Sequence, residues 1–160
     1  EKVKVSAKAI EMIKHHEGVR FKPYRCPAKL WTIGVGHVMY PNQANLPIDR
    51  RMEVDLRPED SRKFTKEEVD AILAHDLDSF ERGVLRMCPT GLTQQRFDAL
   101  VSISFNFGLG TLQRSSIRMK HNRGEFDAAA DAFLLYTKGG GKILPGLVKR
   151  RNDERALYLS

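Results

Sequence analysis

The sequence has 160 residues, 41% of them hydrophobic and 29% charged, and this apolar content excludes an intrinsically disordered chain. No apolar run reaches the roughly 18 residues that a membrane-spanning helix needs. The formal net charge of +7 favours an anionic partner, and nucleic acid, a membrane surface or an acidic wall polymer would each satisfy it.

The first predicted element is a helix of about three turns. Ala9 and Ile13 have helical spacing, Ser6 is placed to cap the N-terminus, and Gly18 is placed to end the helix. Glu17 is the last residue before that glycine. Its carboxyl group would face the negative end of the helix dipole, and partial burial would also disfavour ionisation. We therefore expect Glu17 to stay protonated, as a general acid must; a solvated helix end is the alternative.

A short strand is predicted next. From Trp31 the pattern alternates, with Trp31, Ile33 and Val35 on one face. Thr32 shares the other face with two glycines, so that face is nearly bare, as where a ligand or another backbone approaches. Residues 39–63 are rich in proline and charge, which predicts loops and a short edge strand.

Helices are predicted for the rest of the chain. Thr65 and Glu68 have the spacing of a capping box, and the helix that they begin extends to about residue 87. Residues 93–107 are apolar on most sides, as in a helix at the centre of a core, and Gly108 ends that helix. Shorter helices are predicted at 115–122, 126–136 and 145–159. The glycines at 139–141 are expected to form a flexible loop.

Three polar side chains around the first hairpin suggest a reaction. If Glu17 donates a proton to a glycosidic oxygen, a second group must act across the sugar as nucleophile or as base for a water. Cys26 is the candidate, and Thr32 is placed to orient it or the water; taken alone, Cys26 also fits a small buried hydrophobic residue. A free thiol is mostly protonated at pH 7, so nearby cations are expected to lower its pKa. These are Lys22, Arg25 and Lys29.

The spacing of these residues resembles a known signature. Glu17, eight intervening residues, Cys26, five intervening residues and Thr32 are similar to the pattern of phage-type lysozymes (endolysins). The middle position of that signature is Asp or Cys. The sequence resembles the T-even phage lysozyme family in a Cys-containing variant, with Cys26 where the T-even pattern has Asp. The stretches EGVRFKPY, TIGVGH, FTKEEVDAILAHDLDSFERGVLR, FDALVSISFNFG and LPGLVKRR resemble successive blocks of that family, over most of residues 10–155.

The resemblance implies an α+β, mostly helical, lysozyme-like fold of two lobes. We expect a single domain over residues 1–160, with a β-hairpin lobe at about 15–64, a connecting helix at 65–87, and a helical lobe formed by 1–14 and 88–160. Glu17 would be the acid, Cys26 the second catalytic group and Thr32 its partner. The residues implied to bind the glycan are Val38, Phe105, Asn106 and Ser116. The resemblance also implies a structural ion pair between His37 and Asp76, and a pairing of Arg150 or Arg151 with Glu17.

The activity implied is that of an N-acetylmuramidase. It would cleave the β-1,4 bond between MurNAc and GlcNAc in peptidoglycan during host lysis, with no metal ion and no organic cofactor. We expect a monomer that binds peptidoglycan glycan strands, with no nucleic acid and no stable membrane insertion. It would be made in the host cytoplasm and act on the wall, in the periplasm of a Gram-negative host. The sequence begins with Glu1 rather than Met, which leaves an upstream export or anchoring segment open.

Several alternatives remain open at this stage. Cysteine in place of aspartate leaves the mechanism undecided, since a thiolate attacking the sugar gives retention and a thiolate activating water gives inversion. A lytic transglycosylase would rely on Glu17 and leave anhydro-MurNAc ends. Cys26 with His37 also fits a cysteine peptidase, and the net charge fits a basic nucleic-acid-binding domain. A disulfide between Cys26 and Cys88, in an oxidising compartment, is a further alternative.

Overall fold

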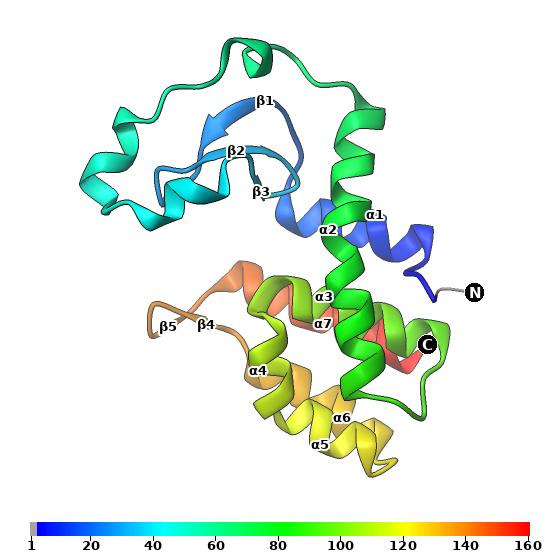
Figure 1. Ribbon diagram of the computed structural model, residues 1–160. Coiled ribbons are helices and arrows are strands. Elements are labelled where there is room, and N and C mark those ends of the chain that lie inside the picture. Colours follow the sequence, from blue (N-terminus) through cyan, green and yellow to red (C-terminus); the bar gives the residue numbers. More distant parts are fainter. Residues whose placement is uncertain (1–2) are drawn as a thin grey trace. The chain divides into compact units, whose positions relative to one another are not determined.

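The computed structural model describes residues 3–160, which form two compact units. The β-bearing unit is Glu17–Asp76; the helical unit combines the described residues up to His16 with Leu77–Ser160. Most of the described chain is helical and there is a small antiparallel sheet, so the expected mostly helical α+β class is confirmed (Figure 1). The single domain over 1–160 stays a prediction, and residues 1 and 2 of its helical lobe lie outside the described residues.

Helix α1 (Ala7–Glu17) begins and ends where the sequence predicts. The Ser6 hydroxyl accepts a hydrogen bond from the Ala9 N–H at 3.3 Å, which satisfies one of the free N–H groups of the first turn. Gly18 has a φ of +82°, a left-handed conformation that glycine adopts at little cost. Ala9 and Ile13 are fully buried. Glu17 is therefore the last helical residue, and the chain turns sharply after it.

The sheet of the β-bearing unit has the order β1-β2-β3. Its strands are β1 (Arg20–Arg25), β2 (Trp31–Gly34) and β3 (His37–Val38), and both pairs are antiparallel. The predicted strand was too long, because the strand ends at Gly34 and the chain turns at Val35 and Gly36. A Cβ added at Gly34 would lie 3.2 Å from Cγ1 of Val69, so at this position the bare face is approached by a side chain of α2.

The prediction for residues 39–63 was partly wrong. The segment contains three short 3-10 helices, η1 (Pro41–Asn45), η2 (Ile48–Glu53) and η3 (Pro58–Asp60), and no strand. Proline opens η1 and η3, where its fixed φ suits a first turn. Two guanidinium groups also bind the segment through main-chain carbonyls. Arg25 donates to Val54 at 2.6 Å and to Arg51 at 2.9 Å, and Arg51 donates to Leu46 at 3.0 Å.

Helix α2 (Lys66–Met87) begins with the predicted capping box. The Glu68 N–H donates to the Thr65 hydroxyl at 3.1 Å, and the Thr65 N–H donates to the Glu68 carboxylate at 3.0 Å. A hydrogen bond from Arg62, followed by that of the Thr65 N–H, lowers the pKa of Glu68 to about 2. The 22 residues of α2 span about 33 Å at 1.5 Å per residue.

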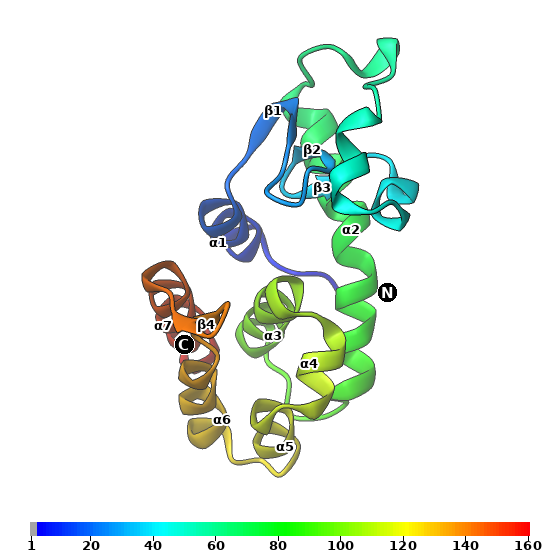
Figure 2. The same cartoon turned by 90° about the vertical axis from the view of Figure 1, so that its left-hand side faces the viewer.

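The core of the helical unit is α3 (Gln94–Phe107), in which residues 97–104 are all buried. It packs against α7 (Pro145–Leu159), and the two lie side by side in both views (Figures 1 and 2). The helices predicted at 115–122 and 145–159 are confirmed as α5 (Ser116–Asn122) and α7. That predicted at 126–136 is α6 (Phe126–Ala132), continued by the 3-10 turn η4 (Phe133–Leu135). Helix α4 (Leu109–Arg114) was not predicted.

The glycine-rich segment is a hairpin, so the expected flexible loop was wrong. Strands β4 (Lys138–Gly139) and β5 (Lys142–Ile143) pair antiparallel. Gly140 and Gly141 connect them with φ values of +58° and +79°, and two positive φ values in succession define the tight turn that suits a hairpin. Among residues 3–160, no helix is both long and apolar enough to cross a membrane.

Candidate active site

The turn between β1 and β2 holds Cys26 in a fixed position. The Cys26 N–H donates to the Leu30 carbonyl at 3.0 Å, and the Lys29 N–H donates to the Cys26 carbonyl at 2.8 Å. Pro27 follows Cys26 in the turn, and Lys29 closes it with a φ of +65°. This is the arrangement of a three-residue hairpin loop whose last residue is left-handed. The thiol therefore lies at the base of a tight turn.

Hydrogen bonds determine the ionisation of this thiol. Burial of the half-buried Cys26 raises its pKa, but hydrogen bonds to the sulfur outweigh burial, so the pKa lies below the ordinary value. In order of effect, the donors are the N–H groups of Leu30 and Ala28, the hydroxyl of Thr32 and the N–H group of Cys26 itself. The expected cause, neighbouring cations, was wrong. The Arg25 guanidinium instead binds the carbonyls described above and lies 4.3 Å from the centre of the Trp31 ring.

Thr32 lies beside Cys26, as predicted, and is only 2% exposed. Its hydroxyl also lies 2.9 Å from the Leu30 carbonyl oxygen. A hydroxyl has one proton to donate, so it serves either this carbonyl or the sulfur at a given moment. Ionisation of the thiol favours the second orientation. Val38 is the cross-strand partner of Thr32, so the structure brings Cys26, Thr32 and Val38 together.

Glu17 belongs to the same compact unit as Cys26 and Thr32. It ends α1, and Gly18 turns the chain into β1, which leads to Cys26. The side chain of Glu17 is exposed, so the partial burial expected from the sequence is not found. Glu17 is thus joined to Cys26 by one glycine turn and one strand.

The predicted ion pair between His37 and Asp76 is confirmed. Nδ1 of His37 lies 2.7 Å from Oδ2 of Asp76, and both side chains are partly exposed. The pair joins β3 to α2 within the β-bearing unit. It fixes the strand that carries Val38.

The other expected glycan-binding residues lie in the helical unit. Phe105 is in the last turn of α3 and packs edge to face on Phe80, with ring centroids 5.3 Å apart. Asn106 follows it, and its side-chain oxygen accepts a hydrogen bond from Arg151. Ser116 opens α5. The role of these residues, and of Val38, in glycan binding stays a prediction.

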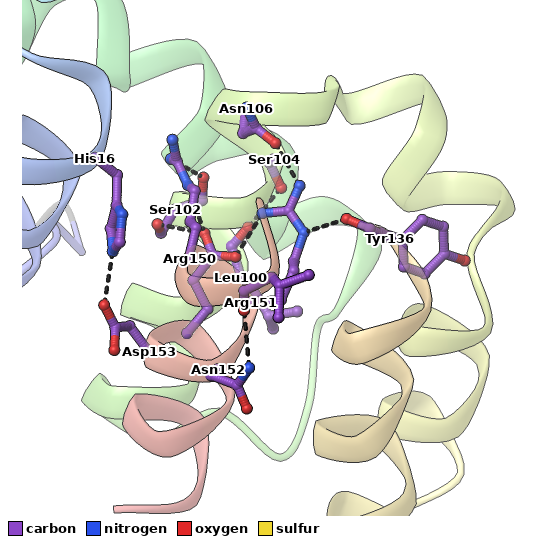
Figure 3. Close-up of polar contacts among 12 residues, drawn as sticks. His16, Leu100, Ser102, Ser104, Asn106, Tyr136, Arg150, Arg151, Asn152 and Asp153 are labelled. Carbon is purple, nitrogen blue, oxygen red and sulfur yellow. Dashed lines mark hydrogen bonds and ion pairs between the residues drawn. The ribbon is translucent and has the colours of Figure 1, made fainter. Parts of the chain in front are cut away.

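A buried ionic cluster in α7 was not predicted from the sequence. Glu154 is fully buried and accepts hydrogen bonds from Arg151 at 2.7 Å, Arg150 at 3.2 Å and Ser102 at 2.6 Å. Figure 3 shows how Arg151 extends from this cluster toward Asn106 and Tyr136. The spacing of Glu154 after the two arginines, three and four residues on, was the available signal. The pairing of Arg150 or Arg151 with Glu17 stays a prediction.

The two cysteines are free, so the disulfide that the sequence left open is not formed. Cys88 is completely buried, and burial raises its pKa to about 11. It is therefore an unreactive core residue, in contrast to Cys26. Among residues 3–160, no three His, Cys, Asp or Glu side chains are grouped so that they could hold a metal ion.

Comparison with known proteins identifies the family. The model of the phage lysozyme family matches residues 14–154. The endolysin of Bacillus phage B103 is 37% identical over 158 residues, which cover 98% of this chain and 54% of that protein. A solved structure of a phage P22 lysozyme mutant superposes with a TM-score of 0.83 at 33% identity, covering 99% of both chains. The muramidase domain of SpmX from Asticaccaulis excentricus gives 0.79 at 31% identity, covering 98% of both.

The chain therefore belongs to the phage lysozyme family. It spans about half the length of the Bacillus phage relative but nearly all of the phage P22 lysozyme. The narrower assignment to the T-even group stays a prediction.

Proposed function

We propose that this protein is an endolysin, a peptidoglycan hydrolase of host lysis that acts as an N-acetylmuramidase. It cleaves the β-1,4 bond between MurNAc and GlcNAc, with Glu17 as general acid and Cys26 as the second catalytic group. The observation that carries the proposal is the position of Cys26 in the tight turn that follows Glu17 and β1, beside Thr32, where hydrogen bonding lowers the pKa of its thiol. A thiol with a lowered pKa supplies the anion that cleavage of a glycosidic bond requires.

The proposed reaction begins with proton transfer. Glu17 donates its proton to the glycosidic oxygen as the bond to the anomeric carbon breaks. The Cys26 thiolate then follows one of two routes. It either attacks the anomeric carbon and forms a thioglycosyl intermediate that water hydrolyses, with Glu17 as base, or it takes a proton from a water that attacks directly. Thr32 stabilises the thiolate before the reaction by turning its hydroxyl toward the sulfur.

The residues proposed to bind the glycan strand are Val38, Phe105, Asn106 and Ser116. The protein acts on the wall as a monomer, reaching the periplasm in a Gram-negative host. Its positive net charge suits a substrate and surroundings that carry negative charge.

The experiment that tests the proposal uses Glu17→Gln, which preserves the shape of the side chain and removes its acidity. We expect lysis of purified walls to fall at least about 100-fold, with an unchanged free energy of unfolding. Glu11→Gln, at an exposed position of the same helix, is the matched control. Substantial residual lysis by the Glu17 variant would show that the acid is misassigned.

The products decide the route and the reaction class. Retained configuration in the first product indicates attack by sulfur, and inversion indicates an activated water. A product lighter by one water would instead show a lytic transglycosylase and overturn hydrolysis. Cys26→Asp is expected to stay active and Cys26→Ser to lose most activity. Equal rates for the serine variant and the unmodified protein would remove Cys26 from the reaction.

A further inference from the structure

The β-bearing unit has a pocket of about 540 Å³, and Glu17, Cys26 and Thr32 do not line it. Its wall includes Lys22, Pro23, Trp31, Leu56, Arg62 and Lys63. Three of these side chains are cationic, and the lining contains no acidic residue. A concave surface lined by one sign of charge over apolar walls concentrates ions of the opposite sign.

The backbone explains why the cations gather. The Phe64 N–H donates to the Phe21 carbonyl at 2.7 Å, which joins β1 to the segment that precedes α2. This bond joins the residues next to Lys22 and Lys63, and both lysines line the pocket. Both side chains are exposed, and neither has an ion-pair partner among the contacts described for residues 3–160. Two ammonium groups therefore line the same pocket, and the contacts described for residues 3–160 pair neither of them with a carboxylate.

Arg62, the third cation of the lining, is already paired with a carboxylate of the protein. Its guanidinium donates to the Glu68 carboxylate at 2.6 and 3.0 Å and lies 4.0 Å from the centre of the Phe64 ring. A guanidinium group binds carboxylates through two parallel hydrogen bonds, and that of Arg62 already makes both of them to Glu68. The lysines remain as point charges, a common way of binding phosphate.

The rest of the pocket lining is mostly apolar. The Trp31 indole N–H donates to the Val54 carbonyl at 2.8 Å, and Arg25 covers part of the ring. These contacts fix the ring next to Pro23 and Leu56. A fixed aromatic ring beside small apolar side chains suits the carbon skeleton of a sugar or polyol better than it suits a bare ion.

We propose that this pocket binds a phosphate group carried on a sugar or polyol, as in phosphorylated wall polymers or lipopolysaccharide. Lys22 and Lys63 bind the phosphate, and Trp31 contacts the carbon skeleton. The binding does not require hydrolysis, so it extends the proposed function without depending on it. It would hold the enzyme on phosphorylated surfaces near its substrate.

The chain contains one tryptophan, so fluorescence reports directly on this pocket. The probe is N-acetylglucosamine 1-phosphate, titrated against the full chain carrying Glu17→Gln so that no cleavage occurs. We expect a saturable change in Trp31 emission, and none with N-acetylglucosamine. The double variant Lys22→Gln/Lys63→Gln should bind about ten-fold more weakly at low salt.

The matched control is Lys8→Gln/Lys142→Gln, which removes the same charge at two exposed positions outside the pocket. This control should bind like the unmodified chain. Equal weakening in both double variants would show a general charge effect and overturn the site. Equal binding of the neutral sugar, or of glucuronic acid, would overturn its selectivity for phosphate.

Two further measurements distinguish the sources of the phosphate. Binding is compared on walls with and without polyol phosphate polymers, and on lipopolysaccharide with and without its phosphates. Loss of affinity on dephosphorylation of one surface, and only for proteins with both lysines, supports the site and identifies its source. If removal of phosphate changes the affinity for neither surface, the proposed phosphate site is overturned. The variant Lys22→Gln/Lys63→Gln should cleave phosphate-free walls at the normal rate. A failure of the phosphate-site proposal is therefore distinguishable from a failure of the proposed hydrolase activity.

Discussion

Nε2 of His16 lies 2.8 Å from Oδ2 of Asp153, which joins the last turn of α1 to α7 (Figure 3). The His16 side chain is 7% exposed and that of Asp153 is 45% exposed. His16 immediately precedes Glu17, so this contact limits the movement of the helix end that carries the proposed acid.

A double-mutant cycle with His16→Ala and Asp153→Asn is expected to give a coupling energy of about 1 kcal/mol in urea unfolding. The value is modest because Asp153 is half in solvent. The more exposed pair Glu11 and Lys14, 3.7 Å apart, should show a smaller coupling. Additive losses at His16 and Asp153 would mean that the contact does not stabilise the fold.

The hydrogen bonds to Cys26 predict a pH dependence. If the thiolate is the active form, lysis increases with pH through the pKa of Cys26, with a midpoint below the ordinary thiol value. Thr32→Val removes one donor to the sulfur and should move the midpoint up. The rate of alkylation of Cys26 by iodoacetamide, measured against pH, checks this without the substrate.

Thr90→Val, at an exposed threonine in the other unit, is the control and should leave the midpoint unchanged. The lowered pKa also makes a contribution to stability at pH above the unfolded thiol value. That contribution is lost as pH falls through the folded value. A midpoint that is the same in Thr32→Val and the unmodified protein would show that the hydroxyl does not reach the sulfur.

Lys29 predicts a measurable strain in the hairpin. Its φ of +65° lies in the left-handed region, which costs a non-glycine residue about 1–2 kcal/mol. Lys29→Gly should therefore leave stability unchanged or raise it by up to about 1 kcal/mol, since the strain relieved exceeds the added freedom of the unfolded chain. Lys29→Val should lower it by about 1–2 kcal/mol. Thermal unfolding of both variants checks the sign, and a stabilising valine would contradict this conformation.

The buried cluster around Glu154 predicts a large loss of stability. Glu154→Ala leaves Arg150 and Arg151, 3% and 1% exposed, without their shared carboxylate. An unpaired buried charge costs about 3–5 kcal/mol, and we expect a loss of that size in denaturant unfolding. Glu125→Ala, at an exposed glutamate, should change stability by less than about 0.5 kcal/mol. A similar loss in both variants would contradict the role of the cluster.

The features that follow from local spacing were predictable. The capping box of Thr65 and Glu68 and the buried helix at 93–107 each follow from side chains a few residues apart, so one sequence is enough to place them. The 3-10 helices of residues 41–60 were missed because their turns are too short to show an apolar period.

The surroundings of Cys26 were predicted only in part. Its partner Thr32 was expected, whereas the main-chain donors at Ala28 and Leu30 were not. Every residue except proline carries a main-chain N–H group, so the type of residue does not tell which N–H group points at the sulfur. That direction depends on the conformation of the turn. The cations near Cys26 could be read from the sequence. In the structure, however, Arg25 donates its hydrogen bonds to main-chain carbonyl groups.

The donors around Cys26 are mostly main-chain N–H groups. They would therefore remain in place if another acidic side chain replaced the cysteine. A carboxylate introduced there would meet the same turn and the same hydroxyl. If Cys26 acts as proposed, a single substitution can therefore exchange a sulfur for an oxygen catalytic group at this position while the surrounding hydrogen-bond donors stay in place.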